Sequence, residues 1–318
     1  MNTEFLRNNP EIRDMLNFDR DLIYIARPED IKRRSSTFYS LSSPKYIQAI
    51  ELIYDKPKSK IDFYRMFLSM VINGQDLLDI IYENISEQET YNLVDLAKQS
   101  FYDMGVIYPE YFTFFSSVKI DVFVKKNKIE HLTKFTFKLE GKQLDRIAFT
   151  IKMATYVINC LRSSNKINDY MSEYQKARVI FQWVVLHTKY PKNIKEEDYT
   201  PYGLFYNGVG VCQAFTGAFN LLCKMENIKV IGIAGQVKNY TEEHIWSYIK
   251  LDNTFSYVDC TWASPLFINE DLLVKYGLNP EQICNFKYFT ISRKNLENTH
   301  CWNRFSFEYL LENNILFL

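Results

Sequence analysis

The feature that most restricts the fold is a helix-forming segment followed directly by three strand-forming segments. The helix is expected to begin at Cys212, because apolar residues with helical spacing follow it: Phe215, Ala218, Phe219, Leu222 and Met225. The next segments, "KVIGIAGQV", "HIWSYIKL" and "FSYVDC", have the composition of strands, and a turn at Asp252 and Asn253 joins the last two. This order predicts an α+β fold in which the helix packs on an antiparallel sheet.

The part of the chain before residue 110 is expected to be mainly helical. Residues 59–103 contain three segments of helical pattern, "SKIDFYRMFLSMVI", "QDLLDIIYENI" and "SEQETYNLVDLAKQSFYDMG". Ser86 and Glu89 have the spacing of a capping box at the start of the third segment, and Gly105 is expected to end it. This region is expected to gate a cleft, recruit a partner or enlarge the core.

A second region begins where the pattern changes. Apolar residues recur at every second position in "SSVKIDVFV", and "KFTFKL" repeats the alternation, which predicts a hairpin over residues 117–139. Helices are expected over 142–162 and from Ser172, whose hydroxyl is placed to cap the second one. We therefore divide the chain into a helical region at 1–110 and a second domain at 111–318.

Charge and composition exclude several classes of protein. The 318 residues include 38 basic and 38 acidic side chains, so no net field attracts nucleic acid or an anionic membrane. The first residues do not resemble a signal peptide, and no run of about 18 apolar residues follows. We expect a cytoplasmic protein without a membrane span, with signal-independent export left open. The six cysteines are scattered, so we expect free thiols.

Cys212 stands where the start of a helix can support thiol chemistry. Unpaired N–H groups and the helix dipole stabilise an anion at this position, and the thiolate is the nucleophilic form of cysteine. Gly208 and Gly210 allow a sharp turn that leaves the sulfur accessible. A cysteine in this setting is nevertheless more often structural, because free cysteine is among the most buried residue types. A chemical role therefore requires a base and a group that orients the base.

His244 is the one of the four histidines to which hairpin geometry links a carboxylate. A two-residue loop at 252–253 sets a register in which Asp259 lies on the same face as His244 and diagonal to it. A three-residue loop would move Asp259 to the opposite face unless a bulge restored it. Cys212, His244 and Asp259 then supply nucleophile, base and orienting group, although such triads occur in different orders on unrelated folds.

The blocks around these three residues resemble the transglutaminase-like superfamily of papain-type thiol enzymes, in the form common in bacterial proteins. They are "GVCQAFTGAFNLLCKMENIKVIGIAG" and "HIWSYIKLDNTFSYVDCTW", where the family has Cys at a helix start, then "H-x-W" and "V-D-x-T-W". The resemblance extends to "YQKARVIFQWVVLHTKYP" and "YFTISRKNLENTHCW", so it covers residues 170–303. It implies an α+β core of the papain type, with the Cys helix packed on an antiparallel sheet that carries His and Asp.

The chain departs from the family in the helix before this core. Relatives often carry an acidic "H-D-Y" stretch there and end it in "Y-D", whereas this chain has "FQW" and then "YP". The outer contacts to a substrate therefore do not carry over from the family.

The resemblance implies thiol-dependent acyl transfer or hydrolysis on a protein or peptide amide, with no cofactor and no metal. Cys212 would form a thioester, His244 would act as the base, and Asp259 would orient the imidazole. Transglutamination, deamidation and proteolysis share this acyl-enzyme and differ in substrate and second nucleophile. Two alternatives stay open. One is a catalytically silent module that binds proteins, and the other is a thiol acyltransferase such as an arylamine N-acetyltransferase-like enzyme, whose Arg-Gly-Gly lead-in is missing here.

Further residues are assigned to the oxyanion site and to the walls. The backbone N–H of Cys212 is the first candidate to bind the oxyanion, with Trp183 or Tyr190 as its side-chain partner. The candidate wall residues are Trp246, Trp262, Gly210 and Gln213, although core packing suits the two tryptophans equally well.

Three more residues near the triad receive structural assignments. His300 and Trp302 are expected to close over the back of the core, and Cys260 is expected to be structural because it points away from Asp259. A zinc site made of Cys212, His244, Cys260 and His300 lacks the usual ligand spacing, so no metal is expected.

Overall fold

The computed structural model describes residues 19–40, 56–126, 131–141, 144–239, 241–267, 270–277, 279, 283–303 and 307–315. The α-helices are α3 (Pro28–Ser40), α4 (Lys60–Ile72), α5 (Glu87–Ile107), α6 (Pro109–Phe112), α7 (Leu144–Ser163), α8 (Glu173–His187), α9 (Pro201–Asn207), α10 (Cys212–Met225), α11 (Glu270–Tyr276), α12 (Arg293–Leu296) and α13 (Glu308–Glu312). The strands are β1 (Leu77–Glu83), β2 (Ser117–Lys126), β3 (His131–Glu140), β4 (Val230–Val237), β5 (Glu243–Leu251), β6 (Thr254–Val258) and β7 (His300–Cys301). Short 3-10 helices lie at η1 (Arg20–Tyr24), η2 (Glu196–Tyr199), η3 (Pro265–Phe267) and η5 (Phe286–Tyr288).

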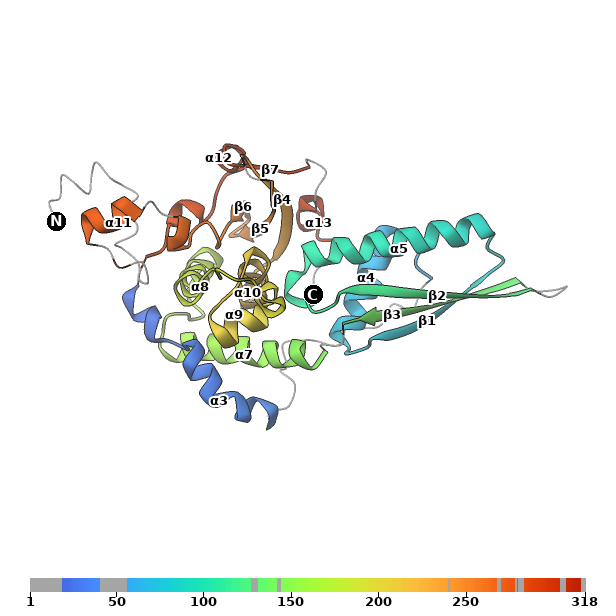
Figure 1. The fold of residues 1–318 in the computed structure, drawn as a ribbon, viewed down its shortest axis with the longest axis horizontal. Helices are drawn as coiled ribbons and strands as arrows, with labels where there is room; N and C mark the ends of the chain where they lie inside the picture. Colours follow the sequence, from blue (N-terminus) through green and yellow to red (C-terminus); the bar gives the residue numbers. More distant parts are fainter. Residues whose placement is uncertain are drawn as a thin grey trace.

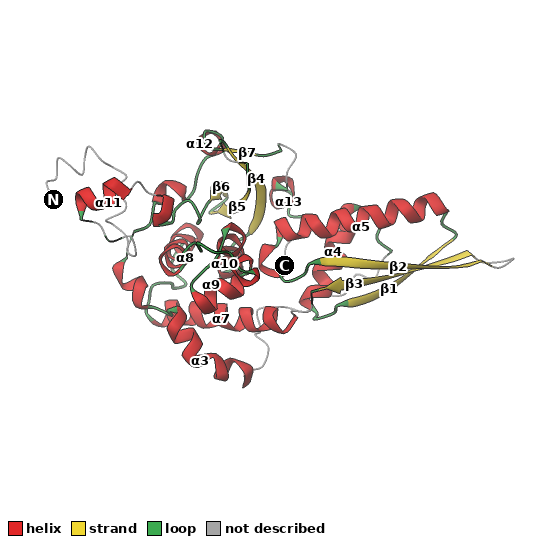
Figure 2. Ribbon diagram, viewed as in Figure 1, coloured by secondary structure: helices red, strands yellow, loops and turns green. Residues whose placement is uncertain are grey.

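Helix α10 is the central element of the larger part of the molecule. It packs against β4 and β5 of an antiparallel sheet with the order β6-β5-β4-β7, and it also contacts α6, α7, α8 and α9. Figure 1 shows α8, α9 and α10 gathered beside this sheet, and Figure 2 shows the mixed helix and strand content. The predicted α+β fold, with the Cys212 helix on an antiparallel sheet, is confirmed.

The hairpin of β5 and β6 has the predicted register. Leu251 pairs with Thr254, and the pairing continues to Ser247 opposite Val258. The two turn residues Asp252 and Asn253 have φ angles of 45° and 68°, the left-handed conformation that a two-residue turn of this type requires.

The same turn is attached to α8. The Asp252 carboxylate accepts the N–H groups of Glu173 and Tyr174, at 3.1 and 3.3 Å, and the Asp252 N–H donates to the Glu173 carboxylate at 2.7 Å. The hairpin is therefore fixed at its tip to the start of α8.

The second sheet has the order β1-β3-β2 and extends away from α10 together with α4 and α5 (Figure 1). The predicted hairpin over 117–139 is confirmed as β2 and β3. The prediction that "QDLLDIIYENI" is helical is wrong, because β1 lies there and pairs with β3, with Ile80 opposite Phe135. Ile80 and Tyr82 are buried between exposed neighbours, which is a strand pattern. A short apolar run fits the helical period and the strand period equally well, and pairing with β3 makes this segment a strand. Strands from both sides of residue 110 share this sheet, and a domain boundary there stays a prediction.

The helix ends follow local signals except at one position. The capping boxes predicted at Ser86 and Ser172 are present at the starts of α5 and α8. The predicted end of α5 at Gly105 is wrong, because the helix continues to Ile107. The helix predicted over 142–162 is α7, and the first two residues of that prediction lie outside the described part of the chain.

A buried ion pair joins α6 to α10. The Lys224 ammonium donates to the Glu110 carboxylate and lies 3.9 Å from the centre of the Tyr108 ring. Burial raises the pKa of Glu110 and lowers the pKa of Lys224, although the charge of each partner opposes the shift of the other. Neither charge is well solvated, so each depends on its partner.

Removing one partner of this pair is expected to destabilise the fold strongly. Lys224→Met should lower the free energy of unfolding by roughly 3–5 kcal/mol, because the Glu110 carboxylate would be left buried without a counter-charge. The double variant Glu110→Gln, Lys224→Met should recover most of that loss. Urea denaturation measures both, with Lys98→Met on the exposed face of α5 as the control. An equal loss in the single and double variants would contradict the coupling.

Candidate functional site

Cys212 is the first residue of α10, and the chain before it is shaped by two glycines. Gly208 ends α9 with a left-handed φ of 68°. Gly210 is buried, and a Cβ there would lie 2.6 Å from the Cβ of Ala214. The capping residue Val211 offers no side-chain acceptor, whereas α4, α5, α8 and α9 begin with a Ser or Thr cap. The first turn of α10 thus presents N–H groups that no capping side chain accepts, beside a partly exposed thiol.

One face of α10 holds Cys212 against β5. Thr216 and Asn220 follow Cys212 at intervals of one turn, so the three residues share a face. The Thr216 hydroxyl donates to the carbonyl of Ile245 at 3.1 Å, and the Ser247 hydroxyl donates to the Asn220 side-chain oxygen at 2.7 Å. These bonds fix the helix beside the start of β5, where His244 lies.

His244 joins the thiol to a buried carboxylate. The His244 Nε2 atom lies 2.8 Å from Asp259 Oδ2, and both side chains are buried. The Cys212 thiol acts on the same imidazole, because it contributes to raising the pKa of His244. The structure therefore brings together the three residues that the sequence selected.

The charges of this group depend on one another. Burial acts to lower the pKa of His244, but the charge and hydrogen bond of Asp259, together with the Cys212 thiol, outweigh it and raise the pKa to about 10. Burial acts to raise the pKa of Asp259, but the charge of His244 and the hydrogen bonds from His244 and His300 hold it well below its usual range. The imidazole is thus stabilised in its protonated form by a carboxylate that stays ionised.

Asp259 has two further partners. The His300 Nε2 atom lies 3.2 Å from Asp259 Oδ2, and its Nδ1 lies 2.8 Å from the Thr299 hydroxyl. The backbone N–H of Trp262 donates to Asp259 Oδ1 at 3.0 Å. The carboxylate thus receives a hydrogen bond from a main-chain group and contacts two imidazole rings.

The sequence placed His300 only at the back of the core. Its position depends on β7, where His300 pairs with Val237 of β4, two residues after the pairing of Gly235 with His244. The closing "H-x-W" block was the signal that could have identified it.

Trp246 and Gly235 form the packing behind the two imidazoles. A Cβ at Gly235 would lie 2.4 Å from the Cys301 carbonyl oxygen and 2.7 Å from the Trp246 ring, so only glycine fits. The Trp246 ring is fully buried, with its centre 5.8 Å from that of His244 and 5.0 Å from that of His300. It supports the imidazoles from the core and does not wall an open site.

The remaining predicted oxyanion and wall residues lie in different surroundings. Trp183 as an oxyanion donor is wrong, because it is buried and its indole N–H donates to the Ile25 carbonyl at 2.8 Å. Gly210 as a wall is also wrong, because it is buried against Ala214. Trp262 is partly exposed, and its ring packs against Tyr288. Burial, followed by the charges of Cys212, Glu242 and Tyr199, raises the pKa of Tyr190 to about 12.

His244, Asp259 and His300 are also the group of described residues whose ligand atoms lie close enough together to hold a metal, within 4.8 Å of one another. The 2.8 Å between His244 Nε2 and Asp259 Oδ2 is a hydrogen-bond distance and is shorter than the separation of about 3.3 Å between two ligands of a tetrahedral zinc ion. Cys260 is buried outside this group, and all six cysteines have free thiols. We therefore interpret the group as a hydrogen-bonded network of two imidazoles and a carboxylate.

No helix in the described part of the chain has the length and apolar character to cross a membrane.

The fold and this site define an α+β class with a thiol at a helix start and a His–Asp pair on the adjoining antiparallel sheet. Residues 162–260, a little under a third of the chain, match the family model of the transglutaminase-like superfamily. This part of the chain therefore has the sequence of a transglutaminase-like domain.

Comparison with individual proteins gives distant similarities. The chain is 20% identical over 117 residues to kyphoscoliosis peptidase of Mus musculus, which covers 32% of this chain and 18% of that much longer protein. Among solved structures, a TGase has 10% identity and a TM-score of 0.31, with 58% of this chain and 50% of that chain covered. A candidate cysteine protease from Cytophaga hutchinsonii has 13% identity and a TM-score of 0.30, with 47% and 65% covered.

Proposed function

We propose that this protein is a thiol-dependent acyltransferase or hydrolase that acts on an amide of a protein or peptide. The observation that carries the proposal is that the buried His244 imidazole lies 2.8 Å from the Asp259 carboxylate, on the strand that packs against the helix beginning at Cys212. Nucleophilic catalysis by cysteine needs this combination of nucleophile, base and orienting group. The match of residues 162–260 to the transglutaminase-like superfamily supports the same class of reaction.

The proposed reaction has two halves. His244 takes the thiol proton, and the Cys212 thiolate attacks the amide carbonyl carbon. The C–N bond then breaks, the amine leaves with the proton from His244, and a thioester remains on Cys212. A water molecule or a second amine attacks this thioester while His244 accepts its proton, and the released thiolate with the His244 imidazolium restores the ion pair that precedes attack. Proton transfer by a positioned base contributes about 10²- to 10⁴-fold.

The negative charge that develops on the carbonyl oxygen needs hydrogen-bond donors. The backbone N–H of Cys212, at the helix start that has no side-chain cap, is one candidate, and the Tyr190 hydroxyl is the other. A raised pKa keeps that hydroxyl protonated, as donation requires. One such donor stabilises the transition state by about 3–4 kcal/mol.

Incubation with casein and a labelled primary amine tests the proposal, with Cys212→Ala as the matched control. Incorporated amine indicates transglutamination, released ammonia alone indicates deamidation, and new N-termini indicate proteolysis. Alkylation by iodoacetamide at pH 6.5 is a substrate-free check. If Cys212 reacts no faster than the other five cysteines, the enzymatic proposal fails and the protein-binding module is the better interpretation.

His300 is proposed to be a positioning residue that keeps the Asp259 carboxylate oriented toward His244. His300→Leu should lower kcat about tenfold with little change in KM, because a hydrogen bond to a charged group contributes about 1.5 kcal/mol. His300→Gln should retain most of the activity, since its amide nitrogen can replace Nε2. Steady-state kinetics on both variants test this role. An equal loss of kcat in His300→Leu and His300→Gln would show that His300 has only a structural role.

A further inference from the structure

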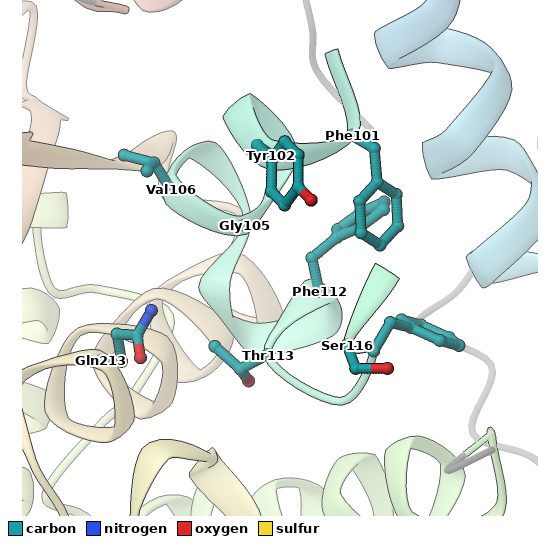
Figure 3. A pocket seen from close by; sticks show the side chains of 9 residues that line it. Phe101, Tyr102, Gly105, Val106, Phe112, Thr113, Ser116 and Gln213 are labelled. Atoms are coloured by element: carbon teal, nitrogen blue, oxygen red, sulfur yellow. The ribbon is translucent and has the colours of Figure 1, made fainter. Parts of the chain in front are cut away.

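A small pocket lies next to the residue that follows Cys212. Its volume is about 280 Å³, and its lining comes from the end of α5, from α6, from the loop before β2 and from Gln213 of α10. Figure 3 shows Gln213 and Thr113 on one side of the space and the Phe101 and Phe112 rings on the other. The pocket therefore joins the α5–α6 region, to which no function has been assigned, to the first turn of the helix that carries the thiol.

The lining defines the chemistry of a ligand. No charged side chain is part of it. The Phe101 and Phe112 rings are buried with their centres 5.9 Å apart. Tyr102, Val106 and Phe115 add to the lining, and Thr113, Ser116 and Gln213 supply hydroxyl and amide groups. Pockets that enclose a whole small molecule have about 300–1,000 Å³, so this one suits a single side chain. An uncharged aromatic or large aliphatic side chain fits it best.

Gly105, which also lines the pocket, is an independent sign that something binds there. The structure describes all ten glycines of the chain. Gly105 differs from the other nine because its φ is not left-handed and a Cβ added to it would still have no atom within 4 Å. It lies inside α5, where glycine weakens a helix relative to alanine. Neither backbone conformation nor packing within the protein requires it. Close approach of a ligand to the backbone is a reason for such a glycine.

We propose that this pocket binds an uncharged aromatic or large aliphatic side chain of the polypeptide substrate, beside the amide that Cys212 attacks. The proposal rests on the proposed function and names the specificity of that site. Gly105 leaves the space that the substrate side chain fills. The segment from α5 to β2 then contributes one wall of the substrate-binding site.

Binding and turnover of blocked glutamine peptides test this proposal separately. The peptides differ in one residue beside the glutamine, which is Phe, Leu, Lys or Glu. Calorimetry with the Cys212→Ala protein should show at least tenfold tighter binding of the Phe and Leu peptides. Gly105→Phe, made in the same background, should abolish that preference because the added ring occupies the pocket. Asn92→Phe, placed on an exposed position of α5 about 20 Å along the helix, should leave the preference intact.

The outcomes separate the two proposals. Gly105→Phe should not lower the melting temperature, since its Cβ meets open space, and it should leave the iodoacetamide rate of Cys212 unchanged. A peptide preference that survives in Gly105→Phe, or equal binding of all four peptides, overturns the pocket proposal. Preferential binding, combined with no reaction of any amide in these peptides or in casein by the wild-type protein, overturns the proposed function and supports the pocket as a peptide-binding site.

Discussion

Replacing His244 with alanine is expected to lower kcat/KM on an amide substrate at least about 10³-fold, because the variant loses both the base and the counter-charge of the thiolate. Alkylation of Cys212 by iodoacetamide at pH 6.5 should slow about 10²-fold. In the wild-type protein Asp259 and Cys212 raise the pKa of His244 to about 10 against the effect of burial, so the imidazolium persists through the neutral range. Rates of turnover and alkylation from pH 5 to 10 measure both effects.

His131→Ala is the matched control, since His131 lies at the start of β3 in the other sheet. It should leave both rates unchanged. An alkylation rate at Cys212 that is the same in His244→Ala and in the wild type would show that the imidazole does not activate the thiol.

Asp259→Asn is expected to be the second most damaging substitution, with turnover lowered roughly 10²- to 10⁴-fold. The carboxylate meets the Trp262 N–H with one oxygen and two imidazoles with the other. An asparagine must turn its NH₂ group toward one of these sides. If the NH₂ faces His244, the proton moves to Nδ1, and the ring can no longer accept the thiol proton.

The pH dependence of this variant follows from the lost charge. Asp259 supplies the interactions that raise the pKa of His244 against the effect of burial, so the pKa falls when the carboxylate becomes an amide. The imidazolium then deprotonates at lower pH, and the alkaline limit of turnover, which needs the imidazolium to protonate the leaving amine, moves down from about pH 10. Asp121→Asn on the exposed part of β2 should shift nothing. An unchanged alkaline limit in Asp259→Asn would contradict the assigned coupling.

The parts of the site that could be predicted from the sequence are those fixed by short-range rules. The start of α10 at Cys212 follows from its apolar spacing, and the β5–β6 register follows from a two-residue turn at Asp252 and Asn253. Both signals lie within a few residues of the feature that they determine. The pairing of His244 with Asp259 is a consequence of that register, so the sequence is sufficient to predict it.

The parts that could not be predicted depend on contacts between distant segments. His300 reaches Asp259 because β7 pairs with β4, and two residues are too few to leave a strand pattern in the sequence. Trp183 is removed from the oxyanion site by a bond to Ile25, which lies far away in the chain. β1 is a strand because β3 offers it a partner, although its apolar run fits a helix as well.

The length of the turn at Asp252 and Asn253 determines whether Asp259 lies on the same face of the hairpin as His244. Because side chains alternate along a strand, one added or lost residue at this tip would reverse the phase of Asp259 relative to His244. The attachment of Asp252 to α8 further penalises a change in loop length there. During divergence of such proteins, this tip should therefore keep its length, while insertions accumulate in loops that do not set the position of a catalytic side chain.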